Sequence, residues 1–189
     1  MEALLLSTLA VAIAEIGDKT QLLSLVLAAR YRKPWAICLG ILVATLLNHA
    51  LAAWLGTLVA QWLSPGTLQW IVGLSFLAVA AWTLVPDKLD DEDALPMTGR
   101  GVFVATLIAF FIAEMGDKTQ FATIALAAKY DALLWVVLGT TIGMMIANVP
   151  AVLLGEGLAR RLPLTQIRWI AAAVFVLTGV LTIAHAGSL

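Results

Sequence analysis

Two copies of one seven-residue motif carry the residues of this sequence that could do chemistry. The first copy, at 15–21, reads Glu-Ile-Gly-Asp-Lys-Thr-Gln, and the second, at 114–120, reads Glu-Met-Gly-Asp-Lys-Thr-Gln. Each copy lies near the midpoint of a long apolar run, where the centre of a lipid bilayer is expected. Charged side chains cost ~2.5–3.5 kcal/mol each at that depth and by default mark a functional site. The motifs therefore predict an intramembrane site built on carboxylates.

The spacing of the acids predicts two carboxylates on one helical face in each motif, because residues three and four apart are neighbours on a helix. Glu15 then lies beside Asp18, and the second motif repeats the arrangement. Each lysine lies four residues after its glutamate, so a Glu–Lys pair that only braces the bundle is the alternative. That alternative leaves Asp18 and Asp117 uncompensated in an apolar setting, which is costly. Together the motifs carry a net charge of −2, which one divalent cation neutralises.

The candidate ligands all offer oxygen. Carboxylates and nearby amides make up the predicted site: Glu15, Asp18, Gln21, Asn48, Glu114, Asp117, Gln120 and Asn148. Oxygen ligands suit the hard cations calcium, manganese and magnesium. Zinc or copper would favour histidine and cysteine. Here Cys38 has no partner, His185 lies near a membrane boundary, and packing explains His49 better than metal ligation.

Some neighbours of the site leave alternatives open. Gly17 and Gly116 either loosen the helix and expose backbone carbonyls or let two helices approach closely. Thr20 and Thr119 donate either to a carboxylate or to their own helix. Interhelical hydrogen bonding is the alternative to a ligand role for the two asparagines.

Pro150 is a difference in sequence between the two halves of the candidate site. It follows Asn148 by two residues and should kink that helix and free a carbonyl near the site. The first half has no proline at the corresponding position. We therefore expect the two walls of the site to differ.

The composition predicts an all-α integral membrane protein. Of 189 residues, 62% are hydrophobic and 12% charged, whereas a soluble domain has ~45–50% apolar and ~25% charged residues. The net charge of −1 gives no indication of nucleic-acid binding. The start resembles a first membrane helix more than a cleaved signal peptide, because Glu2 stands where a positive region is expected.

Six apolar segments are long enough to cross a bilayer, which takes ~20 residues. They are separated by Pro, Gly and charged residues and are predicted as helices at about 3–29, 35–60, 67–86, 101–129, 133–155 and 166–186. The runs are too long and too continuous for the strands of a membrane barrel.

The repeat extends beyond the motif and defines two halves of three helices. Residues 15–31 and 114–130 are identical at 10 of 17 positions. The predicted organisation is a first repeat at 1–86, an acidic cytoplasmic linker at 87–99 and a second repeat at 100–189. An odd number of helices per repeat makes the second repeat enter the membrane from the opposite side. Such inverted repeats are typical of secondary transporters, which bind substrate near the midplane.

The basic residues predict the orientation. Eight of the 11 Lys and Arg residues fall in loops on one side, Lys129 alone falls on the other, and the remaining two belong to the motifs. The positive-inside rule places the eight in the cytoplasm and both termini outside. The linker stretch 87–93 resembles a calcium-binding loop only superficially, because Glu92 stands where an EF-hand needs glycine. A solvated linker is the simpler interpretation.

Clustered buried carboxylates hold either protons or a divalent ion, and these exclude one another. Exposing such a site alternately to each side gives cation/proton exchange without a nucleotide. The sequence has no Walker loop, nucleophile elbow or His-Glu-x-x-His pair, so no enzyme is predicted.

The doubled Glu-x-Gly-Asp-Lys-Thr motif, in two three-helix halves joined by an acidic linker, resembles the GDT-one family, or uncharacterised protein family sixteen. The resemblance covers essentially the whole chain. It implies an exchanger of Mn²⁺ or Ca²⁺ for protons that exports the metal from the cytosol, with Glu15, Asp18, Glu114 and Asp117 as the ion site. The short chain is similar to the bacterial, inner-membrane branch, which implies manganese as the substrate.

Two other functions compete with the exchanger. A divalent-cation channel would use the same acids as a selectivity ring. An intramembrane enzyme holding Mg²⁺ for phosphoryl or prenyl transfer would need a basic cluster at the same depth, where only Lys19 and Lys118 are available. The sequence leaves a homo-oligomer possible and does not separate manganese from calcium.

Overall fold

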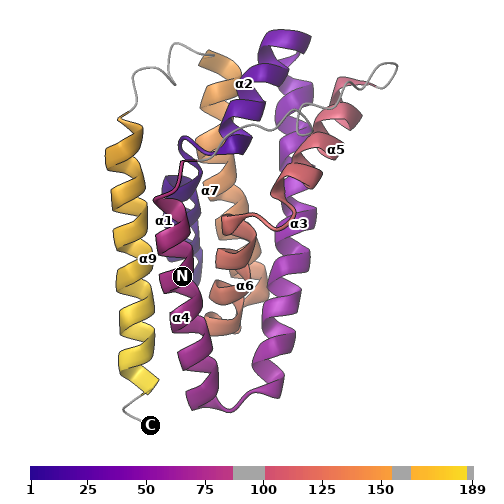
Figure 1. Ribbon diagram of the computed structural model, residues 1–189. Coiled ribbons are helices and arrows are strands. Elements are labelled where there is room, and N and C mark those ends of the chain that lie inside the picture. The colour runs from indigo at the N-terminus through magenta and orange to yellow at the C-terminus, as the bar shows by residue number, and fades with distance from the viewer. Residues whose placement is uncertain (87–100, 155–162, 187–189) are drawn as a thin grey trace.

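The computed structural model describes residues 1–86, 101–154 and 163–186, and these residues form a bundle of helices with no strand among them (Figure 1). The all-α prediction is confirmed. The predicted linker at 87–99 and the basic pair Arg160 and Arg161 lie outside the described residues. The helices of the described ranges are α1 (Glu2–Glu15), α2 (Lys19–Tyr31), α3 (Pro34–Trp62), α4 (Pro65–Thr83), α5 (Val102–Glu114), α6 (Lys118–Tyr130), α7 (Leu133–Leu154) and α9 (Leu164–Ala186).

Four of these helices, α3, α4, α7 and α9, are long and apolar enough to cross a membrane. The longest, α3, has 29 residues and is about 44 Å long at ~1.5 Å per residue. Proline and serine fix where α3 and α4 begin. Pro34 and Pro65 occupy first-turn positions that need no amide donor, and the Ser64 side chain accepts from the Thr67 amide. The protein is therefore a multi-pass membrane protein.

The two motif-bearing segments are each split into two short helices, so the prediction of continuous helices at 3–29 and 101–129 is wrong at the motifs. The chain leaves helical geometry between Glu15 and Lys19 and again between Glu114 and Lys118. A helix of 13 or 14 residues rises about 20 Å, whereas the hydrocarbon core is ~30 Å thick. Two such helices in series are needed to cross it.

Each broken segment packs along a long helix from the other half of the chain. The α1 helix packs on α7, and α5 packs on α3. Glycines make these contacts close: a Cβ atom at Gly139 would lie 2.6 Å from the Leu4 carbonyl oxygen, and one at Gly40 would lie 2.7 Å from Thr106 Cβ. Neither half therefore has a complete core of its own.

The helices α4 and α9 lie side by side, on one flank of the bundle (Figure 1). The rings of Phe76 and Phe175 stack with their centroids 6.2 Å apart, and a Cβ at Gly179 would lie 2.8 Å from the Gly73 carbonyl oxygen. Phe76 and Phe175 are 99 positions apart, the spacing of the two motifs.

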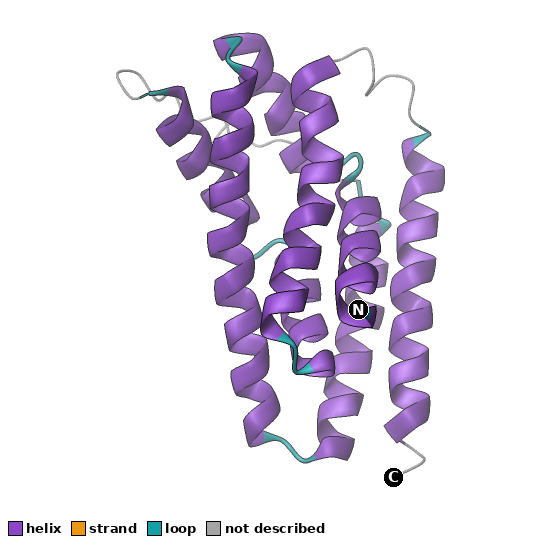
Figure 2. Ribbon diagram, turned by 180° about the vertical axis from the view of Figure 1, so that it is seen from behind, coloured by secondary structure: helices purple, strands orange, loops and turns teal. Residues whose placement is uncertain are grey.

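Large apolar side chains cover the outside of the bundle, whose helices are seen from behind in Figure 2. Trp35 and Trp62, at the two ends of α3, are 79% and 86% exposed. Tryptophan at both ends of a spanning helix is typical of the bilayer interfaces. The exposed apolar surface is therefore the surface that lipid covers.

The close contact at Gly139 makes a prediction about stability. Gly139→Ala should lower the free energy of unfolding by about 1–3 kcal/mol, because the Leu4 carbonyl is backbone and yields little. Unfolding in detergent, followed by tryptophan fluorescence, measures this. Gly66→Ala is the control, since a Cβ there meets nothing within 4 Å. Equal stability of Gly139→Ala and the parent would contradict the packing of α1 on α7.

Candidate cation-binding site

The two motifs break their helices at glycine. Gly17 has φ of +82° and Gly116 has φ of +72°, a left-handed conformation that glycine adopts without steric cost. A tight turn closes each break: the Asp18 amide donates to the Glu15 carbonyl at 3.1 Å, and the Asp117 amide donates to the Glu114 carbonyl at 3.2 Å. Of the two roles that the sequence leaves open for these glycines, loosening of the helix is confirmed.

The glutamine of each motif holds its own break together. The Gly17 amide donates to Gln21 Oε1 at 2.8 Å, and the Gly116 amide donates to Gln120 Oε1 at 2.7 Å. Backbone groups inside a bilayer must find partners within the protein, because no water is available to bond them. The glutamine side chains supply those partners where the helical bonds stop.

The two breaks together bring four helix ends to the site. Asp18 and Asp117 are the residues that precede the first turns of α2 and α6, and the last carbonyls of α1 and α5 end at Glu15 and Glu114. Helix N-termini carry partial positive charge and C-termini partial negative charge. The breaks therefore provide fixed dipoles as well as carboxylates at one depth.

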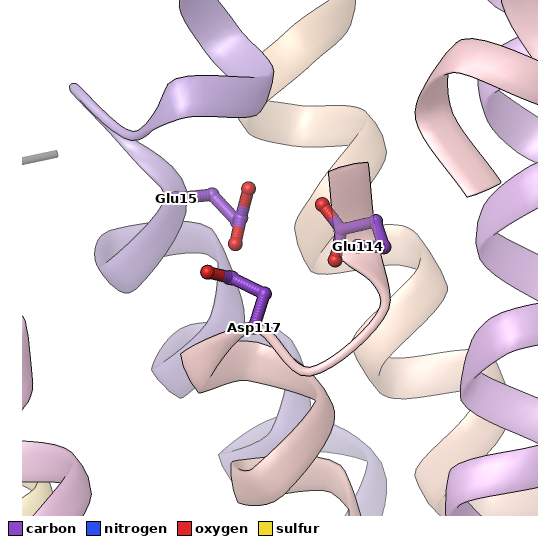
Figure 3. A group of neighbouring side chains, drawn as sticks. All are labelled: Glu15, Glu114 and Asp117. Atoms are coloured by element: carbon purple, nitrogen blue, oxygen red, sulfur yellow. The ribbon is translucent and has the colours of Figure 1, made fainter. Parts of the chain in front are cut away.

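Three carboxylates meet at the breaks. One oxygen from each of Glu15, Glu114 and Asp117 lies within 4.8 Å of the others, and Figure 3 shows the three side chains pointing toward one another. Glu15 comes from the end of α1, Glu114 from the end of α5, and Asp117 from the start of α6. Both glutamates are fully buried and Asp117 is 2% exposed. Three acids of the predicted site are therefore brought together.

The threonines of the motifs orient the two glutamates. Thr20 Oγ1 donates to Glu15 Oε2 at 2.5 Å, and Thr119 Oγ1 donates to Glu114 Oε2 at 3.1 Å. This resolves the alternative that the sequence leaves open for both threonines. The other oxygens, Oε1 of Glu15 and of Glu114, have no hydrogen-bond partner among the described residues. In each glutamate, one carboxylate oxygen is thus held by a threonine hydroxyl, and the other is left without a hydrogen bond from the described residues.

The lysines pair across the motifs and not within them. Lys118 Nζ lies 2.6 Å from Asp18 Oδ1, and Lys19 Nζ lies 3.7 Å from Asp117 Oδ1. The alternative of an internal Glu–Lys brace is therefore wrong, and each aspartate has its counter-charge in the other motif. Asp18 is 1% exposed and does not belong to the group of three carboxylates.

The amide side chains of the predicted site lie next to the breaks. Gln21 Nε2 donates to the Ala147 carbonyl at 3.0 Å, and Asn148 Oδ1 accepts from Ser24 Oγ at 2.8 Å. In the other half, Asn48 Nδ2 donates to the Phe111 carbonyl at 3.0 Å, and Gln120 Nε2 lies 3.4 Å from Asn48 Oδ1. These bonds join the motifs to α7 and α3.

Two features of the site are not expected from the sequence. The lysine–aspartate pairs between the motifs have no signal in the local sequence, because the acid nearest in sequence to each lysine belongs to its own motif. Ser24 lies one turn after Gln21 and donates to Asn148, and its helical spacing is the only sequence signal for this role.

His49 is fully buried, and neither ring nitrogen has a hydrogen-bond partner among the described residues.

A polytopic helical bundle with broken helices that converge on buried carboxylates defines a membrane transporter of cations. A family model described as "Divalent cation/proton antiporter GDT1" matches residues 3–91 and again residues 102–188. The chain belongs to this family. It is therefore a divalent-cation transporter and not an enzyme.

The relatives support the same assignment. The chain is 57% identical over 183 residues to a protein of Vibrio cholerae named "Putative manganese exporter", a match that covers 96% of this chain and 90% of that protein. It is 30% identical over 193 residues to "GDT1-like protein sll0615" of Synechocystis, covering 92% of this chain and 93% of the relative. No solved structure matches the chain.

The left-handed glycines make a prediction about backbone strain. Gly116→Ala should destabilise the protein by about 1–2 kcal/mol through its conformation alone, because a Cβ there meets nothing within 4 Å. Gly116→Asn should cost less, since asparagine tolerates the left-handed region. Gly17→Ala should cost more than Gly116→Ala, because its Cβ would also lie 2.8 Å from the Leu164 side chain. Unfolding in detergent tests this order, and equal stability of all three variants would contradict it.

Proposed function

We propose that the protein exports Mn²⁺ from the cytosol in exchange for protons, and that Glu15, Glu114 and Asp117 hold the ion at this stage of the cycle. The observation that carries the proposal is the convergence of three buried carboxylate oxygens within 4.8 Å. Oε1 of Glu15 and Oε1 of Glu114 have no hydrogen-bond partner among the described residues, which supports a cation as their partner. Oxygen ligands of this kind suit Mn²⁺ and Ca²⁺.

Manganese is the preferred substrate of the proposal. The relative from Vibrio cholerae carries the name of a manganese exporter and is similar over nearly the whole chain. Backbone carbonyls at the ends of α1 and α5, together with the predicted amide ligands Gln21, Asn48, Gln120 and Asn148, are the remaining oxygen donors near the site. Half-helix ends serve cations in this way in other secondary transporters.

Proton exchange follows from mutual repulsion among the carboxylates. Three acids at this separation in an apolar interior cannot all remain charged without a compensating cation. Either Mn²⁺ or protons can supply the compensation, and the two compete for the same oxygens. Full burial of the two glutamates favours this exchanger over a channel, whose acids would line a water-filled path.

We also propose that the two halves, 1–86 and 100–189, are inverted repeats joined by the linker at 87–99. The family model matches the chain twice, once in each half. The packing of α1 on α7 and of α5 on α3 is the reciprocal exchange that a two-fold axis in the membrane plane generates. The stacked pair Phe76 and Phe175 has the spacing of the repeat and supports an axis between α4 and α9.

The proposed location is the inner membrane, with both termini outside the cytoplasm. The eight basic residues on the predicted cytoplasmic side support this orientation through the positive-inside rule. In that orientation the turn between α2 and α3 faces the cytoplasm, and the turn between α3 and α4 faces outward.

Transport by the purified protein in lipid vesicles tests the function. Vesicles with an acidic interior should take up external Mn²⁺, driven by protons leaving down their gradient. Asp117→Asn and Glu15→Gln should each lower the initial rate by about tenfold or more, because even the partners of metal ligands contribute ~10–100-fold to affinity.

Asp131→Asn is the matched control for these acid-to-amide changes. It removes an exposed carboxylate at the end of α6, where φ of 46° suits asparagine. Its rate should equal that of the parent. Parent-like exchange by Asp117→Asn or Glu15→Gln would remove that residue from the site.

Cysteine labelling tests the orientation. In a Cys38→Ala background, which removes the native cysteine, Gly66→Cys should react with a membrane-impermeant thiol reagent in intact cells. Lys33→Cys should react only after the membrane is permeabilised. The opposite pattern would place the termini in the cytoplasm.

A further inference from the structure

The two cross-motif ion pairs are equivalent in sequence but unequal in the structure. Lys118 and Asp18 lie 2.6 Å apart with side-chain exposures of 3% and 0%, whereas Lys19 and Asp117 lie 3.7 Å apart and Lys19 is 22% exposed. Positions 18 and 117, and positions 19 and 118, are related by the repeat of 99 residues. The protein therefore holds one contact in two states, closed in one copy and loosened in the other.

The two ion pairs also differ in where their aspartate lies relative to the three carboxylates. Asp18, in the closed pair, stays outside the group of three carboxylates, and Asp117, in the loosened pair, belongs to it. The two glutamates, Glu15 and Glu114, are in the group from both motifs. The aspartate of the shorter ion pair therefore lies outside the group of three carboxylates, and the aspartate of the longer pair lies within it.

We propose that Asp18 and Asp117 alternate as the third carboxylate ligand of the transported cation, and that Lys118 and Lys19 select between them. When Lys19 closes on Asp117, Lys118 releases Asp18, which joins the two glutamates. This inference rests on the proposed function. It gives Asp18 a ligand role in the opposite state and makes both lysines positioning residues.

Covalent connection makes the exchange concerted. Asp18 and Lys19 are adjacent in the chain, as are Asp117 and Lys118, and each pair begins a helix, α2 or α6. A shift of the start of α6 that withdraws Lys118 from Asp18 also moves Asp117. The same shift therefore opens the Lys118–Asp18 pair and changes the distance between Asp117 and Lys19.

Charge is conserved through the exchange. Four carboxylates and two lysines leave −2 in either state, so one divalent cation balances the site before and after. Each aspartate that leaves the ion gains a lysine, so neither is left as an isolated buried charge. An isolated charge of that kind costs about 3–5 kcal/mol when a buried partner is removed.

The surroundings of the two breaks differ in the same sense as the ion pairs. A Cβ at Gly17 would touch the side chain of Leu164, whereas one at Gly116 meets nothing within 4 Å. The last helix of each half also packs differently: α9 lies against α1, and α4 lies against α6. The helices α1 and α6 are not equivalent, because α1 precedes its break and α6 follows its break. The two repeats are thus in different conformations, as two ends of an exchange require.

The test separates binding from transport in a variant that lacks the closed pair. Asp18→Asn/Lys118→Met removes both charges, and loss of a buried pair together is far milder than loss of one partner. Mn²⁺ binding, measured by electron paramagnetic resonance on purified protein, should stay within about threefold of the parent. Uptake into vesicles should fall by about tenfold or more, because the opposite state has lost its third carboxylate.

Two results with this variant would overturn the proposal. Uptake at the parent rate would make the pair a static brace. Loss of Mn²⁺ binding by the folded variant would place Asp18 in the site of the present state. If the parent itself shows no proton-driven uptake, the proposed function fails. That failure is seen in the parent alone, whereas failure of the alternation is seen as a difference in uptake or Mn²⁺ binding between the variant and the parent.

Lys118→Arg provides a second measurement if the double variant does not fold. Arginine keeps the charge but grips a carboxylate with two parallel hydrogen bonds, so it should hold Asp18 and favour the present state. We expect Mn²⁺ binding to be kept and uptake to fall several-fold. Uptake at the parent rate by Lys118→Arg would overturn the proposal, since a static brace tolerates the change.

Discussion

Four carboxylates buried at one depth in an apolar bundle must be neutralised, and this requirement ties the two halves of the chain together. Each motif contains a lysine, but that lysine compensates an aspartate of the other motif. Neither half therefore balances its own charges. The same dependence appears in packing, where α1 rests on α7 and α5 on α3. Charge and packing both require the halves to fold as one unit.

A second constraint shapes the breaks. Opening a helix inside a bilayer frees backbone groups that water cannot reach. Here the motif itself supplies the remedy, because Gln21 and Gln120 bond the glycine amides directly. The spare amide hydrogens of the same glutamines bond α7 or α3. The residues that repair the backbone thus also fix the position of the acids relative to the long helices.

The sequence predicts most of the helices, because apolar runs and their charged interruptions follow directly from bilayer thickness. It predicts continuous helices through the motifs and leaves loosening at the two glycines as one of two alternatives, since an isolated glycine is common within continuous membrane helices. It also fails at the lysines. Local spacing pairs Lys19 with Glu15, and only the three-dimensional arrangement brings Asp117 within 3.7 Å of Lys19. Asp18 is separated from the other acids for the same reason.

Nearly identical motifs occupy different surroundings, and the cause lies outside the motifs. Gln21 donates to the Ala147 carbonyl, in the turn of α7 that precedes Pro150, whereas Gln120 approaches the side chain of Asn48 on α3, which has no proline at that place. A symmetric pair of motifs would offer the ion two equivalent glutamates and two equivalent aspartates. Unequal walls instead leave three acids together, while Asp18 lies outside that group in the shorter of the two ion pairs. A repeat that is exact in its acids and inexact in its supports therefore favours one arrangement of the acids at a time.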